Sequence, residues 1–275
     1  MKVFAGIVAF RPDPERLLQN IAAVREQVAG VAVFDNGGLD RGILPDGVAV
    51  LGEGVNLGIA AALNALCAFA GEQGCGWALT LDQDSVCPEG LVDAYVPYTE
   101  DESIGMLCPA VKDRGYGSLP YDGGCSGTEE VDACITSASM IRLSAWEKAG
   151  GFREDFFIDM VDFDICWTLK EKGFRILRVN GKSLLQEIGR SRKVRLFGKE
   201  EAVFNHSPLR CYYMARNTLA LGKIHGRSGQ CRRWVLKRML LIGLYEKDKR
   251  RKLCMMLRGW KDYRKGISGK YDGNA

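Results

Sequence analysis

The stretch VFAGIVAFRPDPERLLQNIAAVREQVAGVAVFDN, residues 3–36, decides the fold, because it predicts a strand, a helix and a second strand in direct succession. Residues 3–10 are a continuous apolar run, which is typical of a strand buried on both faces of a parallel sheet. Asp13 and Pro14 then supply a helix N-cap and a first-turn proline. Apolar residues follow at helical spacing: Leu17, Leu18, Ile21, Val24 and Val28.

The same alternation continues beyond this stretch. Residues 31–34 and 48–51 are short apolar strands, 58–69 form an alanine-rich helix, and 77–81 form a fourth strand that ends at Asp82. Strands and helices that alternate at such short spacing predict an α/β fold with a doubly wound, mostly parallel sheet. Ligands bind such sheets outside the carboxyl ends of the strands, which is where the polar residues after these strands fall.

Two carboxylates follow the fourth strand in the sequence Leu81-Asp82-Gln83-Asp84-Ser85. Asp82 and Asp84 repel each other unless a positive charge lies between them. A hard cation such as Mg²⁺ or Mn²⁺ takes oxygen ligands and commonly joins carboxylates to substrate phosphates. The motif therefore indicates a metal site, although a solvated loop with two acids is the simpler alternative.

A second acidic group, Asp159, Asp162 and Asp164, lies within the apolar segment 156–167. On the helix that we expect over residues 159–172, Asp159 and Asp162 share a face and Asp164 points elsewhere. Partial burial would raise a carboxyl pKa toward values that suit a general base. The alternative is that these acids stabilise the positive end of the helix dipole.

Residues 56–60, Asn-Leu-Gly-Ile-Ala, place Gly58 at the entrance of a helix, where backbone N–H groups can meet a phosphate. The segment lacks the full glycine pattern of a dinucleotide-binding or P-loop motif. A tight turn at Gly58 is the alternative explanation.

The composition is that of an ordinary globular protein, with 47% hydrophobic and 26% charged residues among 275. No apolar run approaches the roughly 18 residues that cross a bilayer, and we expect no signal peptide because the N-terminus leads directly into a strand. The ten cysteines are scattered without zinc-site spacing, so we expect them to be reduced and mostly buried. These features predict a cytoplasmic location.

The charge divides the chain into two parts. Residues 1–222 hold 22 Lys and Arg against 30 Asp and Glu, whereas residues 223–275 hold 16 against 4. We predict a catalytic domain over 1–222 and a basic amphipathic helical region over 223–275. Cations beside Trp and Leu are typical of helices that lie on anionic membrane surfaces. The alternative is that the apolar residues pack on the catalytic domain or on a partner in a homodimer; no nucleic-acid motif accompanies the charge, so we expect no nucleic-acid partner.

In chain order, these motifs resemble the inverting glycosyltransferases of family 2, which have the GT-A fold, and especially their bacterial rhamnosyltransferase branch. The resemblance covers about residues 3–220 and rests on six segments: Ile7-Val8-Ala9-Phe10, Val33-Phe34-Asp35-Asn36, Asn56-Leu57-Gly58-Ile59-Ala60, Leu81-Asp82-Gln83-Asp84-Ser85, Phe157-Ile158-Asp159-Met160-Val161-Asp162 and Arg210-Cys211-Tyr212-Tyr213-Met214-Ala215-Arg216-Asn217. No single segment is decisive, but all six occur in the correct order.

The resemblance implies a role for particular residues. Asp162 would be the general base, with Asp159 beside it as an acceptor-binding residue or alternative base. Asp82 and Asp84 would hold a divalent metal, Mg or Mn, at the diphosphate. Donor-binding residues would be Ala9, Phe10, Asp35, Asn36, Asn56, Gly58, Asp82 and Gln83, of which Ala9 and Phe10 line the base pocket and Asp35 accepts a hydrogen bond from the pyrimidine.

The implied reaction transfers a sugar with inversion from a dTDP- or UDP-linked donor, rhamnose being the branch's sugar, to a glycan or lipid-linked glycan acceptor in cell-surface polysaccharide synthesis. The protein would be cytoplasmic or peripheral on the inner face of the cell membrane. Two positions depart from the family: Val161 replaces the usual acid before the base, and Gln186 stands where the branch often has His. Without that His, metal binding would be weaker or would use Glu187.

Two alternatives stay open. One is a nucleotide-sugar-binding relative with weak or no turnover, in view of Val161 and Gln186. The other is a sugar-nucleotide pyrophosphorylase, which would normally have a glycine-rich loop after its first strand, where this chain has Arg11-Pro12-Asp13-Pro14.

Overall fold

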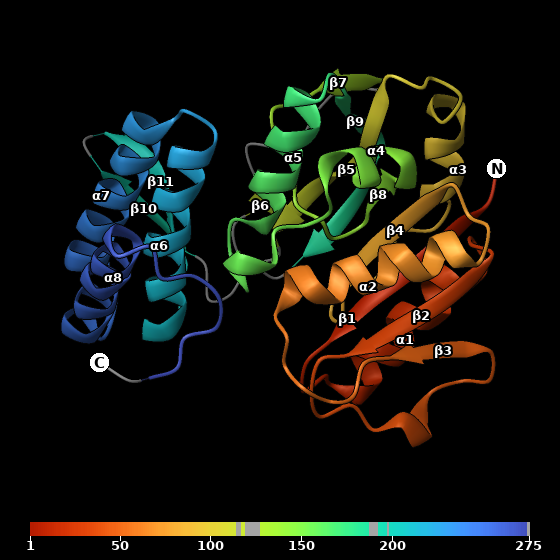
Figure 1. Cartoon of the computed structure of the whole chain (residues 1–275), viewed down its shortest axis with the longest axis horizontal. Coiled ribbons are helices and arrows are strands. Elements are labelled where there is room, and N and C mark those ends of the chain that lie inside the picture. Colours follow the sequence, from red (N-terminus) through yellow and green to blue (C-terminus); the bar gives the residue numbers. More distant parts are fainter. Residues whose placement is uncertain (114–116, 119–126, 187–191, 197, 274–275) are drawn as a thin grey trace.

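A mixed β-sheet forms the centre of the larger part of the molecule in the computed structural model, which describes residues 1–113, 117–118, 127–186, 192–196 and 198–273 (Figure 1). Its first half is parallel and has the strand order β3-β2-β1-β4. These strands are β1 (Val3–Ala9), β2 (Gly30–Asp35), β3 (Val48–Leu51) and β4 (Trp77–Asp82). All four match apolar runs from which strands were predicted.

The second half of the sheet mixes directions. β8 (Ser139–Arg142) lies antiparallel between β4 and β5 (Ile104–Asp113), and β5 pairs in parallel with β9 (Arg175–Gln186). Two short strands, β6 (Gly117–Ser118) and β7 (Thr128–Glu130), pair antiparallel with β5 and β9 respectively. The predicted α/β fold with a mostly parallel, doubly wound sheet is therefore confirmed.

Helices cover both faces of this sheet because alternate residues of the buried strands point to opposite sides. Ala5 and Ile7 of β1 pack in one apolar cluster with α1 (Pro14–Arg25) and α3 (Leu91–Tyr95). Phe4 and Val8 pack in the other, with α2 (Ile59–Glu72), α4 (Leu143–Ala149) and α5 (Val161–Glu171). Three short 3₁₀ helices lie in the connections: η1 (Arg41–Ile43), η2 (Val96–Tyr98) and η3 (Glu154–Phe156).

The C-terminal part consists of three helices and a hairpin, which lie together at the left of Figure 1. The elements are β10 (Arg192–Leu196), β11 (Lys199–Val203), α6 (Pro208–Ile224), α7 (Ser228–Tyr245) and α8 (Lys249–Arg264). Cys211, Ala215 and Leu219 of α6 form an apolar core with residues of both later helices: Val235, Ile242 and Met256. The division into domains at residue 222 stays a prediction; that residue lies near the end of α6.

Two further expectations bear on the whole chain. Nine cysteines lie in the described ranges; all are free thiols, and seven are buried, which confirms the prediction for them. Among the helices that the structure describes, none combines the length and apolar character that a membrane span requires.

Candidate active site

The carboxyl end of β4 is fixed from two sides. The backbone N–H of Asp82 donates to Ser137 Oγ at 3.1 Å, and its carbonyl oxygen accepts from Asn20 Nδ2 at 2.8 Å. Directly after the strand, Gln83 Oε1 accepts the backbone N–H of Phe10 at 2.7 Å. The ends of β1 and β4, including Ala9 and Phe10, are therefore joined, and Gln83 uses its side-chain oxygen for that purpose.

Asp35 and Asn36, at the end of β2, are both buried and hydrogen-bonded. Asp35 Oδ1 accepts the backbone N–H groups of Gly37 at 3.1 Å and Leu39 at 3.4 Å, and Arg41 approaches Oδ2 at 3.4 Å. Asn36 Oδ1 accepts the N–H of Leu57 at 2.8 Å. This amide therefore ties the end of β2 to the loop that precedes α2.

That loop ends at Gly58, which adopts a φ of +90°. Its N–H donates to Asn56 Oδ1 at 3.0 Å, and its carbonyl accepts from Asn36 Nδ2 at 3.3 Å. A Cβ at position 58 would lie 2.6 Å from the carbonyl oxygen of Phe157, which accepts the N–H of Ile59 at 2.7 Å. Glycine is required here because the start of α2 contacts the turn that carries Asp159.

The turn itself has an unusual backbone. Phe157, Asp159 and Met160 have φ values of +62°, +65° and +66°, in a region that residues with a side chain rarely occupy. Such conformations persist only where the surroundings hold them. Asn217 of α6 does so, because its Nδ2 donates to the carbonyl oxygens of three turn residues, Phe156, Ile158 and Asp159, at 2.8, 2.7 and 3.1 Å.

Asp159 lies in this turn and not on a helix. α5 begins at Val161, so the expectation that Asp159 and Asp162 share a helical face is wrong; Met160 adopts a left-handed conformation that interrupts the helix before it reaches Asp159. The two carboxyls still interact, because the charge of Asp159 contributes to raising the pKa of Asp162.

Arg210, at the start of α6, pairs with this acidic group. Its Nε lies 3.0 Å from Asp159 Oδ1, whereas the buried Oδ2 has no hydrogen-bond partner among the described residues. Burial raises the pKa of Asp159, and Arg210 opposes the rise. The Arg210 side chain is 46% exposed, so it also contacts solvent.

Burial also shifts the pKa values of two other acids, Asp162 and Asp82. It raises the pKa of Asp162 to about 6. The pKa of Asp82 rises to about 7, mainly through burial and then through repulsion from Asp84 and Asp162, while Arg210 lowers it. Asp82, Asp84, Asp159, Asp162 and Arg210 therefore share one electrostatic environment.

Asp82 and Asp84 suit a divalent cation that takes only a few of its ligands from the protein. In the described ranges, no three His, Cys, Asp or Glu side chains converge as a metal-binding set. Asp82 and Asp84 nevertheless place two mutually repelling carboxylates together, and a hard cation that shares its ligands with a diphosphate needs few protein oxygens. Gln186 ends β9, and Glu187 lies outside the described residues.

Asp164 and the two histidines contact other protein side chains. Asp164 is buried, with Arg153 Nε and His225 Nε2 each 3.0 Å from Oδ1. His225 is buried: only 1% of its side chain is accessible, and it lies against Trp167 and between the carboxylates of Asp164 and Glu171. His206 stacks on Phe204, and burial, followed by Arg210, lowers its pKa to about 3.

No role was predicted for Arg210 or Asn217, although both fall in the segment 210–217 that contributed to the resemblance. Their spacing of seven residues, about two helical turns, places them on one side of α6. An arginine and an asparagine at this helical spacing were the available signal.

No protein-family model matches the sequence. The chain is 26% identical over 241 residues to dTDP-rhamnosyl transferase RfbF of Shigella flexneri, a match that covers 80% of this chain and 79% of that protein.

Two solved structures show the same fold at low sequence identity. TarS of S. aureus in complex with UDP-GlcNAc matches with a TM-score of 0.59 and 14% identity, over 97% of this chain and 82% of that one. GalNAc-T7 with UDP, GalNAc and Mn²⁺ matches with a TM-score of 0.56 and 13% identity over 86% of this chain, which spans only 56% of the GalNAc-T7 chain. The chain has the GT-A fold of glycosyltransferases.

Proposed function

We propose that this protein is a glycosyltransferase that moves a sugar from a nucleoside diphosphate donor to an acceptor hydroxyl. The observation that carries the proposal is the group of four acids: Asp82, at the end of β4, interacts electrostatically with Asp84 and with Asp162 at the start of α5, and Asp162 interacts in turn with Asp159. The similarity to a dTDP-rhamnosyl transferase supports the same reaction class.

The donor is proposed to lie over the ends of β1, β2 and β4. Ala9 and Phe10 would line the base pocket, and the ring of Phe10 is available because 41% of that residue is exposed. Asp35 already accepts two backbone N–H groups and the Arg41 guanidinium, yet a carboxylate has about four acceptor positions and can take a further hydrogen bond from a pyrimidine N–H. We favour dTDP-rhamnose as the donor because the chain is similar to a dTDP-rhamnosyl transferase. UDP-linked sugars are the alternative.

Asp82 and Asp84 are proposed to hold Mg²⁺ or Mn²⁺, which would supply positive charge to the departing diphosphate when bound. Mn²⁺ and UDP are both present in the GalNAc-T7 structure. Asn36, Asn56 and Gly58 fix the loop before α2, so their contribution to donor binding would be to shape the site through the backbone.

Asp162 is proposed as the general base. Its carboxylate would accept the proton of the acceptor hydroxyl while that oxygen bonds to the anomeric carbon and the bond to the diphosphate oxygen breaks. A single displacement of this kind inverts the anomeric centre. Burial supports the assignment, because a pKa of about 6 makes Asp162 a stronger base than an ordinary aspartate and leaves it ionised at neutral pH.

Asp159 in the strained turn and Arg210 at the start of α6 are proposed to assist the reaction. The ion pair with Arg210 fixes Oδ1 of Asp159, while the buried Oδ2 has no hydrogen-bond partner among the described residues. The exposed part of Arg210 carries positive charge beside three acids whose pKa values it lowers. A glycan or lipid-linked glycan is the proposed acceptor, in line with cell-surface polysaccharide synthesis.

The test is release of nucleoside diphosphate from dTDP-rhamnose and from a panel of UDP-sugars in the presence of Mn²⁺. We expect slow release to water, faster release with a suitable glycan, and loss of both in Asp162→Asn. Binding of a donor without release under any condition would instead favour the nucleotide-sugar-binding relative.

A further inference from the structure

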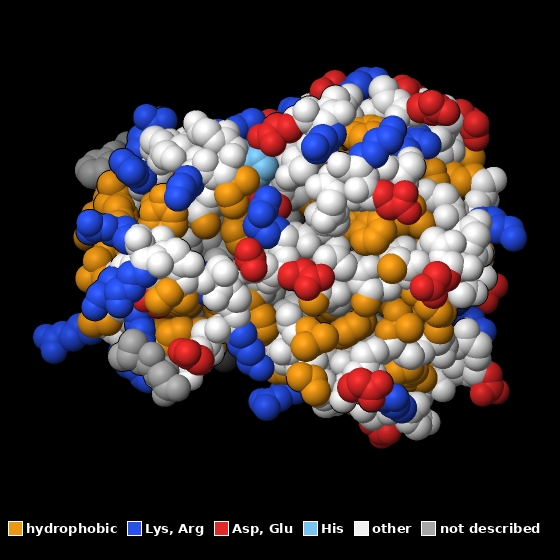
Figure 2. Space-filling view, in the orientation of Figure 1, with side chains coloured by type: hydrophobic (Ala, Val, Ile, Leu, Met, Phe, Trp, Pro, Cys, Tyr) orange, Lys and Arg blue, Asp and Glu red, His pale blue; other side chains and the backbone are white. Residues whose placement is uncertain are grey.

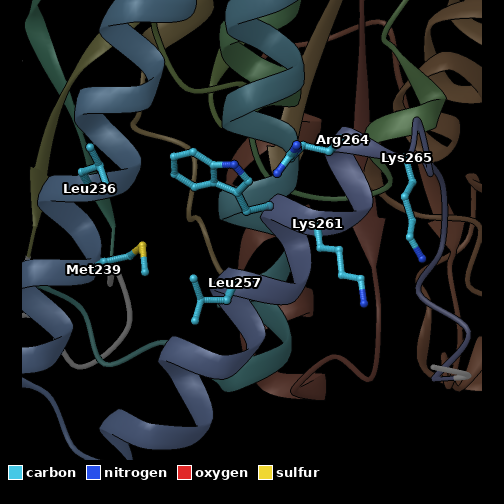
Figure 3. Close-up of a pocket in the computed structure, with 7 residues that line it drawn as sticks. Leu236, Met239, Leu257, Lys261, Arg264 and Lys265 are labelled. Carbon is cyan, nitrogen blue, oxygen red and sulfur yellow. The ribbon is translucent and has the colours of Figure 1, made fainter.

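An open groove lies between α7 and α8. Its apolar lining consists of Leu236 and Met239 from α7 and Leu257 and Trp260 from α8, and its volume is about 660 Å³. Figure 3 shows Leu236 and Met239 on one helix and Leu257 on the other, across the groove. We call this feature the α7–α8 groove.

Exposed leucines extend the apolar surface along α7. Leu236, Leu240 and Leu244 recur every four residues, so they form one stripe, and they are 55%, 41% and 51% exposed. Leu257 of α8 is 56% exposed. Other apolar residues of 223–275, such as Val235, Ile242 and Met256, are buried against α6. The exposed set is therefore a distinct surface that internal packing leaves uncovered.

Cations border this surface. Lys261, Arg264 and Lys265 line the groove itself, and Arg232 and Arg233 lie exposed near the start of α7. Figure 2 shows Lys and Arg side chains interspersed with hydrophobic ones over this part of the molecule. None of these five takes part in an ion pair within the described ranges.

The acids of the same region do not neutralise these cations. Glu246 is buried between Arg238 and Lys252, and Asp262 accepts the Tyr212 hydroxyl at 2.9 Å in the interior. Asp248 pairs with Arg251 at 3.8 Å. Within the described ranges, therefore, no ion pair neutralises the five cations at the α7–α8 groove.

We propose that the α7–α8 groove and the leucine stripe dock this protein on an anionic phospholipid surface. The leucines would enter the boundary between headgroups and acyl chains, while Lys261, Arg264 and Lys265 extend to lipid phosphates. Charge complementarity selects this occupant. A second copy of the chain, related by a two-fold axis, would instead bring the same cations face to face. The docking does not depend on the proposed transfer reaction.

The experiment is sedimentation of the full chain with phosphatidylcholine vesicles, with and without phosphatidylglycerol, at low and high salt. We expect binding only to vesicles that contain phosphatidylglycerol, and weaker binding at high salt because exposed charges are screened. The variant Lys261→Glu/Arg264→Glu/Lys265→Glu should lower the partition coefficient at least about tenfold, given the attraction of each cation for an anionic leaflet.

A matched control separates this surface from the net charge. Lys2→Glu/Arg25→Glu/Lys172→Glu makes the same change in charge at exposed positions of the α/β part, and it should retain most of the binding. Leu236→Ser/Leu240→Ser should weaken binding at both salt concentrations. Equal losses in the two triple variants, equal binding to vesicles of phosphatidylcholine alone, or no binding would overturn the proposal.

A second copy as the occupant is tested by analytical ultracentrifugation. A dimer that Leu236→Ser/Leu240→Ser dissociates would also overturn membrane docking. Calorimetry with dTDP and UDP in Mn²⁺ distinguishes this failure from that of the proposed function: we expect the groove variants to bind nucleotide like the unmodified chain, because the groove contains no proposed donor-binding residue.

Discussion

At the scale of single residues, the reactivity of Asp162 depends on its surroundings. The carboxyl lies in the first turn of α5, where the positive end of the helix dipole favours the ionised form, yet burial and the neighbouring Asp159 raise its pKa to about 6. This value keeps the group ionised at neutral pH and able to hold a proton during transfer.

Replacement of the base should separate catalysis from donor binding. We expect Asp162→Asn to reduce transfer about 10²-fold or more, because an amide cannot accept the proton, and to leave donor affinity nearly unchanged. Initial rates and calorimetric donor titration measure the two effects. Asp159→Asn is the control; if it removes transfer and Asp162→Asn does not, the base is Asp159.

The rate should also depend on pH through Asp162. The carboxylate must be deprotonated to act, and its pKa is about 6, so the transfer rate should fall about tenfold per unit as the pH decreases below that value. Single-turnover rates at saturating donor and Mn²⁺ measure this dependence. A rate that stays constant down to about pH 4.5 would show that an unperturbed group, or none, acts as the base.

At the scale of elements, the site depends on how α2 and α6 hold the turn before α5. α2 contacts the turn through Gly58 and Ile59, and α6 contacts it through Asn217. Phe157 also stacks on Tyr213 of α6, with ring centroids 5.5 Å apart. The backbone strain at three residues is therefore balanced by contacts from elements far apart in sequence.

Gly58→Ala tests this contact. The new Cβ would meet the Phe157 carbonyl at 2.6 Å in a strained conformation, so we expect a loss of roughly 1–3 kcal/mol in the free energy of unfolding and slower transfer. Urea unfolding provides the measurement. Gly74→Ala is the matched control, because its φ is also positive but its Cβ would contact nothing. Equal losses in the two variants would mean that the contact with Phe157 is unimportant.

The sequence predicted the elements whose signals are local. Residues 3–10 and 77–81 are apolar runs bounded by polar residues, and Asp13 caps α1 through its bond to the Arg16 N–H. The antiparallel placement of β8 between β4 and β5 could not be predicted, because strand pairing depends on distant partners. The left-handed Asp159 and Met160 were also missed, since no glycine marks them.

At the scale of the whole molecule, α6 joins the two parts of the chain. Asn217 and Arg210 reach the acidic site, while Cys211, Ala215 and Leu219 pack against α7 and α8. His225, directly after α6, reaches back to α5 through Asp164. The C-terminal helices therefore support the helix that positions the site.

Removal of residues 223–275 should consequently disrupt folding. The truncated chain would expose the α6 side chains that pack against α7 and α8, and an apolar surface of this kind favours aggregation. We expect 1–222 to elute as aggregates in size-exclusion chromatography, whereas the full chain does not. A monomeric, cooperatively unfolding 1–222 fragment would show that the predicted domain is independent of the helices.

The central claim is that the acids at the end of β4 hold a nucleoside diphosphate through a divalent cation. Calorimetric titration of dTDP and UDP, with and without Mn²⁺, tests it most directly in the unmodified chain and in Asp82→Asn and Asp84→Asn. We predict that the unmodified chain binds one of the nucleotides only with Mn²⁺ and that both variants lose this binding. Equal affinity in all three proteins, or no binding of either nucleotide to the unmodified chain, would contradict the claim.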